Sequence, residues 1–366
     1  MTVDDRRSQA LRVAYTLEQC WHPVPGGTAT AALAVAGELL DDPSIELVPV
    51  AGRHARLPRP EYRSPVPVRA LPVARPLLYE LWLRARWPKV EGATGPVDVA
   101  HATGLVPCAS LAPMIVTVHD LAFLHSPQHF SRHGVRLMRR SLDVIRRRAH
   151  YVLCSSEATM SDCEAAGIDV GRLRHVPLGI DVRPVPGDDA DRLARYDLPE
   201  RFALFVGTLE PRKNLVRLAE AIARLGDLPL IVAGAQGWGQ AAPSASAHVR
   251  FIGFVPAADL ASLYAAATVF VYPSEREGFG LPVLEAMAQG TPVVTSAATS
   301  TEEVAGGAAV LVDPFCVDSI AAGIGEAVEH ADELAERGRR RAETMTWAAT
   351  AAATRAVYLE AAGRVS

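Results

Sequence analysis

Several features that are common in chains of this size are scarce here. Only two lysines occur, Lys89 and Lys213, against 35 arginines. The five cysteines show no C-x-x-C spacing, which argues against a metal site, and they are too few for a disulfide scaffold. We therefore expect small buried thiols in a reducing compartment.

Long apolar runs are also missing. No window reaches the roughly 18 apolar residues that a membrane-spanning helix needs, and residues 1–12 lack the apolar core of a signal peptide. We expect a cytoplasmic protein, with peripheral attachment to the inner face of the membrane as the second option.

What is present suits a globular chain of more than one domain. The 366 residues are 49% hydrophobic and carry a net charge of -4, and a chain this long divides more readily into two domains than it fills one core. The charge is uneven, because residues 1–183 sum to +4 and the remainder to -8. A basic half is thus joined to an acidic half.

Short apolar runs alternate with loops and amphipathic helices, a pattern typical of parallel α/β architecture. The expected strands are residues 11–17, 97–101, 114–120, 151–155, 202–207, 228–234, 249–253, 269–273, 293–296 and 309–312. The expected helices are residues 28–40, 132–150, 214–225 and 282–289, with Thr28 and Asn214 as N-caps and Gly290 as a C-terminal cap.

This pattern predicts two doubly wound, Rossmann-like domains that face each other across a deep cleft. The first covers residues 1–183, and a Pro/Asp-rich linker covers 184–200. The second domain covers 201–345. A last helix within 346–366 is expected to pack back on the first domain.

Two loops of the second half carry candidate ligand-binding residues. In residues 208–214, Arg212 and Lys213 precede a helix start, where backbone amides already favour an anion such as a diphosphate. The alternative is an exposed basic pair, which the helix dipole disfavours. Because Lys213 is one of only two lysines, a compact ammonium at this position indicates a function that arginine would not serve.

The second loop joins Glu277 to a helix that Pro282 is expected to begin, which places Glu285 in the first turn. Gly278 and Gly280 allow close backbone approach to phosphate oxygens, and Glu285 suits paired hydroxyls such as those of ribose. In the alternative reading, the glycines form a plain turn and Glu285 only complements the helix dipole.

In the first half, His119 ends an apolar strand, where a neutral imidazole can bind a substrate hydroxyl. Gly26 and Gly27 lie in the first strand–helix loop and can approach the same ligand. A structural histidine and an ordinary turn are the alternatives.

These residues carry a resemblance to a known family. The stretches FVGTLEPRKNLVRLAEAI, VAGAQGW and EREGFGLPVLEAMAQGTPVV resemble retaining glycosyltransferases of family 4, which have the GT-B fold. Glu277 and Glu285 match the E-x(7)-E element of that family. TVHDLAF, CSSEAT and VPLGID give a looser match in the first half. Residues 53–95 match no motif of the family that we identify, and we assign them to variation on the acceptor side.

The resemblance implies roles for these residues. Arg212, Lys213 and the backbone amides of the 278–281 loop would stabilise the leaving nucleotide diphosphate, Glu285 would hold the ribose, and Glu277 and His119 the donor sugar. The implied catalytic set is His119, Glu277, Arg212 and Lys213. The implied donor-binding set is Gly26, Gly27, Gly207, Arg212, Lys213, Glu277, Gly278, Phe279, Gly280, Leu281 and Glu285.

The implied reaction moves a hexose, with mannose from GDP-mannose as the favoured donor, to a glycan, a lipid-linked acceptor or a small molecule, with retention at the anomeric carbon. No cofactor and no metal are expected, because the only D-x-D, at residues 189–191, lies in the linker. No nucleic-acid partner is expected.

Two other functions remain open from the sequence. The fold would also suit a nucleotide-sugar-binding protein without turnover. A nicotinamide dehydrogenase is a further alternative because of Gly234, Gly237 and Gly239, although their spacing is not G-x-G-x-x-G.

The predicted helix over residues 132–150 is strongly basic. Val135, Met138, Leu142 and Ile145 are expected on one face of this helix. The opposite face is expected to carry the arginines Arg132, Arg136, Arg139, Arg140, Arg146 and Arg147. This face is either an ordinary solvated surface or a contact with anionic lipid.

Overall fold

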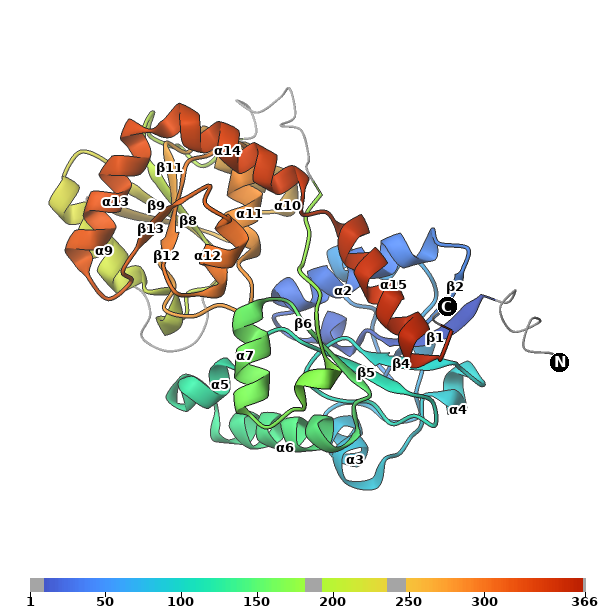
Figure 1. Ribbon diagram of the computed structural model, residues 1–366. Helices are drawn as coiled ribbons and strands as arrows, with labels where there is room; N and C mark the ends of the chain where they lie inside the picture. Colours follow the sequence, from blue (N-terminus) through green and yellow to red (C-terminus); the bar gives the residue numbers. More distant parts are fainter. Residues whose placement is uncertain (1–9, 182–192, 236–247, 365–366) are drawn as a thin grey trace. The chain divides into compact units, whose positions relative to one another are not determined.

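The computed structural model describes residues 10–181, 193–235 and 248–364. It divides into two compact units (Figure 1). Unit 1 contains the chain up to Gly179 together with Trp347 onward, and unit 2 runs from Ile180 to Thr346. The sequence predicted this boundary at residue 183, followed by a linker over residues 184–200. Residues 184–192 of that linker lie outside the described residues, and residues 193–200 belong to unit 2.

The described part of unit 1 holds a seven-stranded parallel sheet in the order β3-β2-β1-β4-β5-β6-β7. The strands are β1 (Leu11–Thr16), β2 (Ile45–Ala51), β3 (Arg69–Ala70), β4 (Val99–Ala102), β5 (Met114–Val118), β6 (Tyr151–Cys154) and β7 (Leu173–His175). Except in the exposed edge strand β3, their apolar residues are almost fully buried, which is expected for a parallel sheet covered on both faces.

The α-helices of unit 1 are α2 (Gly26–Leu40), α3 (Leu77–Ala85), α4 (Glu91–Thr94), α5 (Ala122–His125), α6 (Arg132–Arg148), α7 (Glu157–Ala165) and α15 (Trp347–Ala361). The C-terminal helix α15 packs on α2 (Figure 1). Its Tyr358 hydroxyl lies 2.6 Å from Nδ1 of His101 in β4. The end of the chain is therefore part of the core of unit 1.

The described part of unit 2 holds a six-stranded parallel sheet in the order β10-β9-β8-β11-β12-β13. The strands are β8 (Ala203–Val206), β9 (Leu230–Ala233), β10 (Val249–Gly253), β11 (Val269–Tyr272), β12 (Val293–Ser296) and β13 (Val310–Val312). The helices are α9 (Leu215–Leu225), α10 (Ala257–Ala266), α11 (Leu281–Ala288), α12 (Ser300–Ala305), α13 (Val317–Glu329) and α14 (Ala331–Glu343).

Most expected elements are present, with shifted ends. Thr28 is not the N-cap of its helix: α2 begins two residues earlier, at Gly26, and the Thr28 hydroxyl donates to the carbonyl of Pro25. Asn214 does occupy the N-cap position of α9, but its side chain makes no capping hydrogen bond. Gly290 follows the last turn of α11 with a φ of 74°, as a C-terminal glycine should.

Both sheets share one topological feature. Strand order reverses at β1 and β4 in unit 1 and at β8 and β11 in unit 2. In open parallel sheets, ligands bind outside the carboxyl ends of strands at such a reversal. The loops that follow β8 and β11 are therefore the first place to look for a site in unit 2.

Candidate active site

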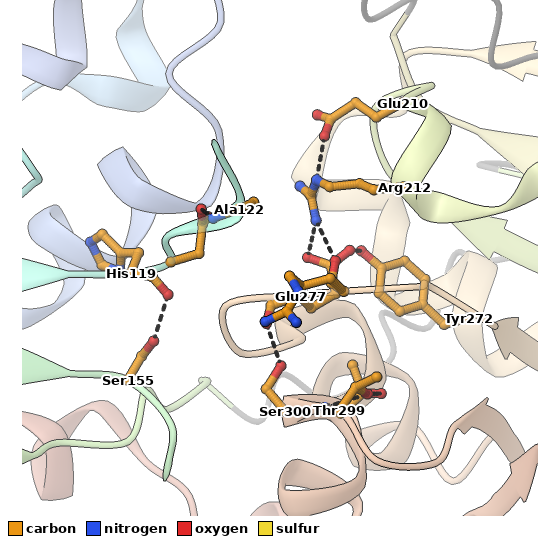
Figure 2. A network of polar contacts seen from close by, with 12 residues as sticks. His119, Ala122, Ser155, Glu210, Arg212, Tyr272, Glu277, Thr299 and Ser300 are labelled. Carbon is orange, nitrogen blue, oxygen red and sulfur yellow. Dashed lines mark hydrogen bonds and ion pairs between the residues drawn. The ribbon is translucent and has the colours of Figure 1, made fainter. Parts of the chain in front are cut away.

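Arg212 joins the two loops at the strand reversal of unit 2 (Figure 2). It lies in a short 3₁₀ turn, Pro211–Lys213, that follows β8. Its Nε donates to Glu210 at 2.7 Å, and its Nη1 lies 2.6 Å from Glu277, which follows β11. The same Nη1 donates to the carbonyl of Arg276 at 3.0 Å. The guanidinium is therefore held in one orientation by groups from both loops.

Lys213 is the most unusual charge of the site. Its side chain is buried, with 6% of the residue exposed, and within the described ranges its ammonium has no hydrogen bond or ion pair. The ring of Tyr272 faces it, with Nζ 5.4 Å from the ring centroid. Burial lowers the pKa of Lys213 more than the nearby carboxylates of Glu277 and Glu210 raise it. A buried cation without a paired anion is costly, and a bound anion would remove that cost.

Gly207 leaves room for this ammonium. It follows β8 directly, and a Cβ placed on it would lie 2.6 Å from Nζ of Lys213. A Cβ on Gly234, after β9, would in turn lie well inside contact distance of the Gly207 carbonyl. Gly234 requires glycine because the backbone of Gly207 passes so closely, whereas a Cβ at Gly207, whose φ is 153°, would push the end of the lysine side chain aside.

Glu277 balances the two cations. Its Oε1 accepts a hydrogen bond from the Tyr272 hydroxyl at 2.9 Å, and its Oε2 faces Arg212. Burial alone would raise the pKa of Glu277, but the charges of Arg212 and Lys213 outweigh it, and the pKa lies below its usual value. Glu277 is therefore an anion at neutral pH.

The glycine loop ends where α11 begins. Gly280 is the N-cap of α11 with a φ of 119°, a conformation that side chains rarely adopt, and a Cβ there would lie 2.8 Å from Cγ2 of Thr301. The backbone carbonyl of Glu277 accepts from the Ser300 hydroxyl at 2.8 Å (Figure 2). Phe279 is buried, with 5% exposed, so its contribution to a ligand site would come from its backbone.

The expected position of Glu285 in the first turn of its helix is wrong by one residue. Because α11 begins at Leu281, Pro282 is the second helical residue and Glu285 lies in the second turn. Its Oε2 accepts a hydrogen bond from the hydroxyl of Tyr264 in α10, at 2.8 Å. A neighbouring helix thus helps to orient this half-buried carboxylate.

In unit 1, His119 follows β5 at the carboxyl edge of the sheet. Its carbonyl accepts from the hydroxyl of Ser155 at 3.2 Å (Figure 2). It also accepts from the hydroxyl of Thr159 at 3.2 Å. Its ring donates to the carbonyl of Thr103, while Nε2 is buried and has no hydrogen bond among the described residues. Burial lowers the pKa of His119 more than Asp120 and Thr103 raise it, so the imidazole is neutral at pH 7.

Gly26 and Gly27 begin α2, next to the carboxyl end of β1. Gly26 has a φ of 61°, and a Cβ placed on it would meet nothing within 4 Å. The glycine is therefore required by its backbone conformation, while the space beside it is open. His119, Gly26 and Gly27 belong to unit 1, and the remaining predicted site residues belong to unit 2.

Several residues of the two sites were not predicted. In unit 2 they are Glu210 and Tyr272, which orient Arg212 and Glu277. In unit 1, the side chain of Thr103 bonds to the Thr16 carbonyl and accepts from Gln19 at 2.6 Å. Glu210 was detectable from its position after a strand and two residues before Arg212. Tyr272 looks like an ordinary core residue of a strand and gives no such signal.

The basic helix α6 differs from its expected pattern at one arginine. Arg140 is not on the open face, because it forms an ion pair with Glu80 of α3 at 2.9 Å. Arg146 pairs with Asp143 at 3.4 Å. Arg132, Arg136, Arg139 and Arg147 are exposed, while Leu142 and Ile145 are buried on the opposite side.

Other expectations concern metals, cofactors and membranes. Within residues 10–181, 193–235 and 248–364, no group of three His, Cys, Asp or Glu side chains is placed to hold a metal ion. The D-x-D at 189–191, and Gly237 and Gly239 of the dehydrogenase alternative, lie outside these ranges. None of the helices in the same ranges is long and apolar enough to cross a membrane.

Comparison with known proteins agrees with this architecture. A family model described as Glycosyl transferases group 1 matches residues 193–345, and one described as Glycosyltransferase Family 4 matches residues 25–183. The MMP alpha-(1->4)-mannosyltransferase of Mycolicibacterium hassiacum is 32% identical over 312 residues, which cover 76% of this chain and 74% of that protein. The O-antigen chain mannosyltransferase B of Escherichia coli is 35% identical over 253 residues, 64% of this chain and 66% of its own length.

Among solved structures, that of Anabaena Alr3699/HepE in complex with UDP and glucose superposes with a TM-score of 0.71 at 19% identity, covering 95% of this chain and 99% of that one. Two parallel α/β units with these neighbours define a GT-B fold, as predicted. The chain belongs to the glycosyltransferases of the family 4 type, and within them it is similar to mannosyltransferases.

Proposed function

We propose that the protein is a retaining glycosyltransferase that moves a hexose from a nucleoside diphosphate sugar to a glycan, a lipid-linked acceptor or a small molecule. The observation that carries the proposal is Lys213, a buried ammonium with no ion pair in the described ranges, next to the oriented guanidinium of Arg212. Two fixed cations at the strand reversal of a parallel sheet suit a diphosphate.

The proposed chemistry needs charge stabilisation more than proton transfer by the protein. The bond between the sugar C1 and the diphosphate oxygen breaks, and the acceptor oxygen bonds to C1 on the same face. The acceptor proton passes to the departing phosphate oxygen. Arg212 and Lys213 stabilise the charge that develops on the diphosphate, an effect that is usually the largest single contribution to catalysis.

The other residues would bind and orient the donor. Glu285 would accept from the ribose hydroxyls, with Tyr264 holding its other side. Glu277 would accept from a hydroxyl of the donor sugar, and the neutral Nε2 of His119 would meet the sugar near C1. The amides of Gly278–Leu281 and of Gly26 and Gly27 would contact the donor, and neither a metal nor a cofactor is part of the proposal.

Mannose from GDP-mannose is the proposed donor, because the two mannosyltransferases compared above match 64% and 76% of this chain. A cytoplasmic location is proposed with it, since nucleotide sugars are made there, and the exposed arginines of α6 would allow peripheral contact with anionic lipid.

Nucleotide release from a panel of GDP- and UDP-sugars tests the proposal. Wild type should release the nucleotide slowly to water from its own donor, and Glu277→Ala should lose this activity. Glu275→Ala is the matched control, because Glu275 lies two residues away and pairs with Arg217 at 2.7 Å. Release that is the same in Glu277→Ala and wild type would contradict the site, and binding without any release would favour a non-catalytic protein.

A further inference from the structure

Unit 1 contains a run of arginines without acidic partners. Residues 53–75 hold six arginines and a single acid, Glu61. The six arginines are Arg53, Arg56, Arg59, Arg63, Arg69 and Arg75. None of them forms an ion pair within the described residues. Elsewhere in the same unit, arginines do pair, as Arg12 with Glu46 and Arg174 with Glu360. This segment lies within residues 53–95, which the sequence resemblance did not explain.

Two of these arginines are fastened to the loop between β1 and α2. The indole Nε1 of Trp21 donates to the carbonyl of Arg56 at 2.9 Å. The guanidinium of Arg59 donates to the carbonyl of Pro23 at 3.4 Å. This loop follows β1 at the strand reversal of unit 1 and leads directly into Gly26. Arg56 and Arg59 are therefore attached to the loop at the edge of the sheet where ligands bind.

Arg75 is the most informative member of the group. Unlike the other five it is half-buried, and it lies beside Tyr79 of α3, whose hydroxyl is 3.0 Å from Nε2 of His22. Partial burial of a guanidinium without an anion is unfavourable, and a phosphate would offset it through paired N–H···O bonds.

The imidazole of His22 reports on this charge. Burial, Arg75 and His54 together lower the pKa of His22 to about 4. The other groups around it are Tyr79 from α3 and Glu18, whose charge also acts on Tyr79. An anion bound to Arg75 would counter part of this effect and raise the pKa of His22.

A rigid aromatic pair adjoins the arginines. The rings of Trp21 and His54 stack at 4.5 Å with an angle of 7°. Nε2 of His54 lies 3.1 Å from the carboxylate of Glu18, which also accepts from the amide of Gly52 at 2.7 Å. Pre-formed aromatic surfaces with a few placed polar groups are typical of small-molecule sites.

We propose that these residues form an acceptor subsite that binds a phosphate group, and hence that the acceptor is a phosphorylated, hydroxyl-rich small molecule such as a sugar or polyol phosphate. The phosphate subsite is defined as Arg56, Arg59, Arg75, His22 and Tyr79, with Trp21 and His54 as its aromatic wall. The term acceptor rests on the proposed function. Arg75 favours a single phosphate over a flat lipid surface, because a half-buried guanidinium is reached more easily by a small anion.

Binding of inorganic phosphate and of mannose 6-phosphate, with mannose as the uncharged comparison, tests this subsite without turnover. Titration calorimetry gives affinities, and NMR follows the His22 ring. In wild type, both phosphates should bind and raise the pKa of His22, whereas mannose should bind at least tenfold more weakly than mannose 6-phosphate. Arg75→Gln should weaken phosphate binding about tenfold or more, and Arg75→Lys should retain part of it.

Arg136→Gln is the matched control, because Arg136 is an exposed arginine of α6 in the same unit, and it should bind phosphate like wild type. Equal phosphate affinity in Arg75→Gln and wild type would overturn the proposal. Binding to vesicles that contain phosphatidylglycerol, lost in Arg75→Gln, together with no binding of either small phosphate, would overturn it in favour of a lipid surface.

The experiments distinguish a failure of the proposed function from a failure of the phosphate subsite. If wild type releases no nucleotide from any nucleotide sugar but Arg75→Gln still abolishes phosphate binding, the transferase proposal fails and the anion subsite stands. If donor release is normal in both proteins and neither binds phosphate, only the subsite is wrong.

Discussion

Nη1 of Arg212 lies 2.6 Å from Oε2 of Glu277, and this pair joins the loops that follow β8 and β11. The contact uses one side of the guanidinium and fixes the plane of the rest. It also places a carboxylate next to the buried ammonium of Lys213, which is not itself paired within the described residues. The two cations are thus held in place before any ligand binds.

Replacing Arg212 by Ala should reduce kcat for nucleotide release about 100-fold or more, because a pre-oriented charge at the leaving group is lost. Arg224→Ala is the control, since Arg224 pairs with Asp318 at the exposed side of α9 and should remain as active as wild type. Steady-state kinetics with a saturating nucleotide sugar measures both. If Arg212→Ala raises KM and leaves kcat unchanged, the prediction is wrong, because the arginine then binds the donor equally well in the ground state and in the transition state.

The pH dependence of the reaction should show an early loss at high pH. Burial lowers the pKa of Lys213 below its ordinary value of 10.5, so the ammonium loses its proton, and its charge, sooner than a free lysine. We expect kcat/KM to fall on the basic side with an apparent pKa below 10.5, as the free enzyme deprotonates. Lys213→Arg should move this limb to higher pH, because a guanidinium stays protonated. If kcat/KM of Lys213→Arg falls at the same high pH as in wild type, the group that titrates there is not Lys213.

Gly207→Ala should damage the site without changing any charged residue. The added Cβ would lie 2.6 Å from Nζ of Lys213, closer than packed atoms tolerate, so the ammonium must move. A displacement of this size can cost up to about 100-fold in kcat/KM. Gly37→Ala, in the middle of α2 with open space around it, should leave activity unchanged and stabilise the fold by roughly 0.5–1 kcal/mol. Full activity of Gly207→Ala would show that Lys213 does not need its observed position.

Much of this architecture was predictable because it depends on local patterns. Residues 249–253 and 293–296 were expected as strands and are β10 and β12, since short apolar runs between turn residues identify buried parallel strands. Arg212, Lys213 and Glu277 were found from their positions after strands, where parallel sheets present ligand-binding loops.

What could not be predicted depends on contacts between distant residues. Asn214 was placed correctly at a helix start, but its side chain donates to the carbonyls of Pro273 and Pro314, which lie 59 and 100 positions away. No local rule gives these partners. Glu285 was placed one helical position too early because α11 begins after Gly280, at Leu281, and not at Pro282.

The burial of His101 predicts an acid sensitivity of unit 1. Burial, with a smaller contribution from the neighbouring His119, lowers the pKa of His101 from 6.5 to about 3. Between these values the unfolded chain binds a proton that the folded protein does not, so this histidine makes stability fall as pH decreases, by up to about 1.4 kcal/mol per pH unit. Urea unfolding at several pH values should show a smaller loss between pH 7 and 5 in His101→Gln than in wild type. The same loss in both proteins would show that His101 is not responsible.

Removing the Tyr358 hydroxyl should loosen the C-terminal helix. Tyr358→Phe leaves the buried Nδ1 of His101 without its partner, which costs about 1–3 kcal/mol. Thermal unfolding and hydrogen exchange of α15 measure the loss. Tyr62→Phe, at a half-buried tyrosine, is the matched control and should change stability little. A wild-type unfolding temperature in Tyr358→Phe would mean that water replaces the lost partner.

The exposed arginines of α6 decide whether the protein attaches to anionic membranes. Replacing Arg136, Arg139 and Arg147 together by Gln removes three positive charges from the open face, each worth about 1 kcal/mol near an anionic surface. If the helix binds lipid, co-sedimentation with phosphatidylglycerol vesicles should drop strongly in this variant and at high salt. Arg140→Gln is the matched control, because Arg140 is committed to Glu80 and its loss should cost stability rather than lipid binding. Wild type that fails to sediment with these vesicles at low salt would show that the arginines form an ordinary solvated face.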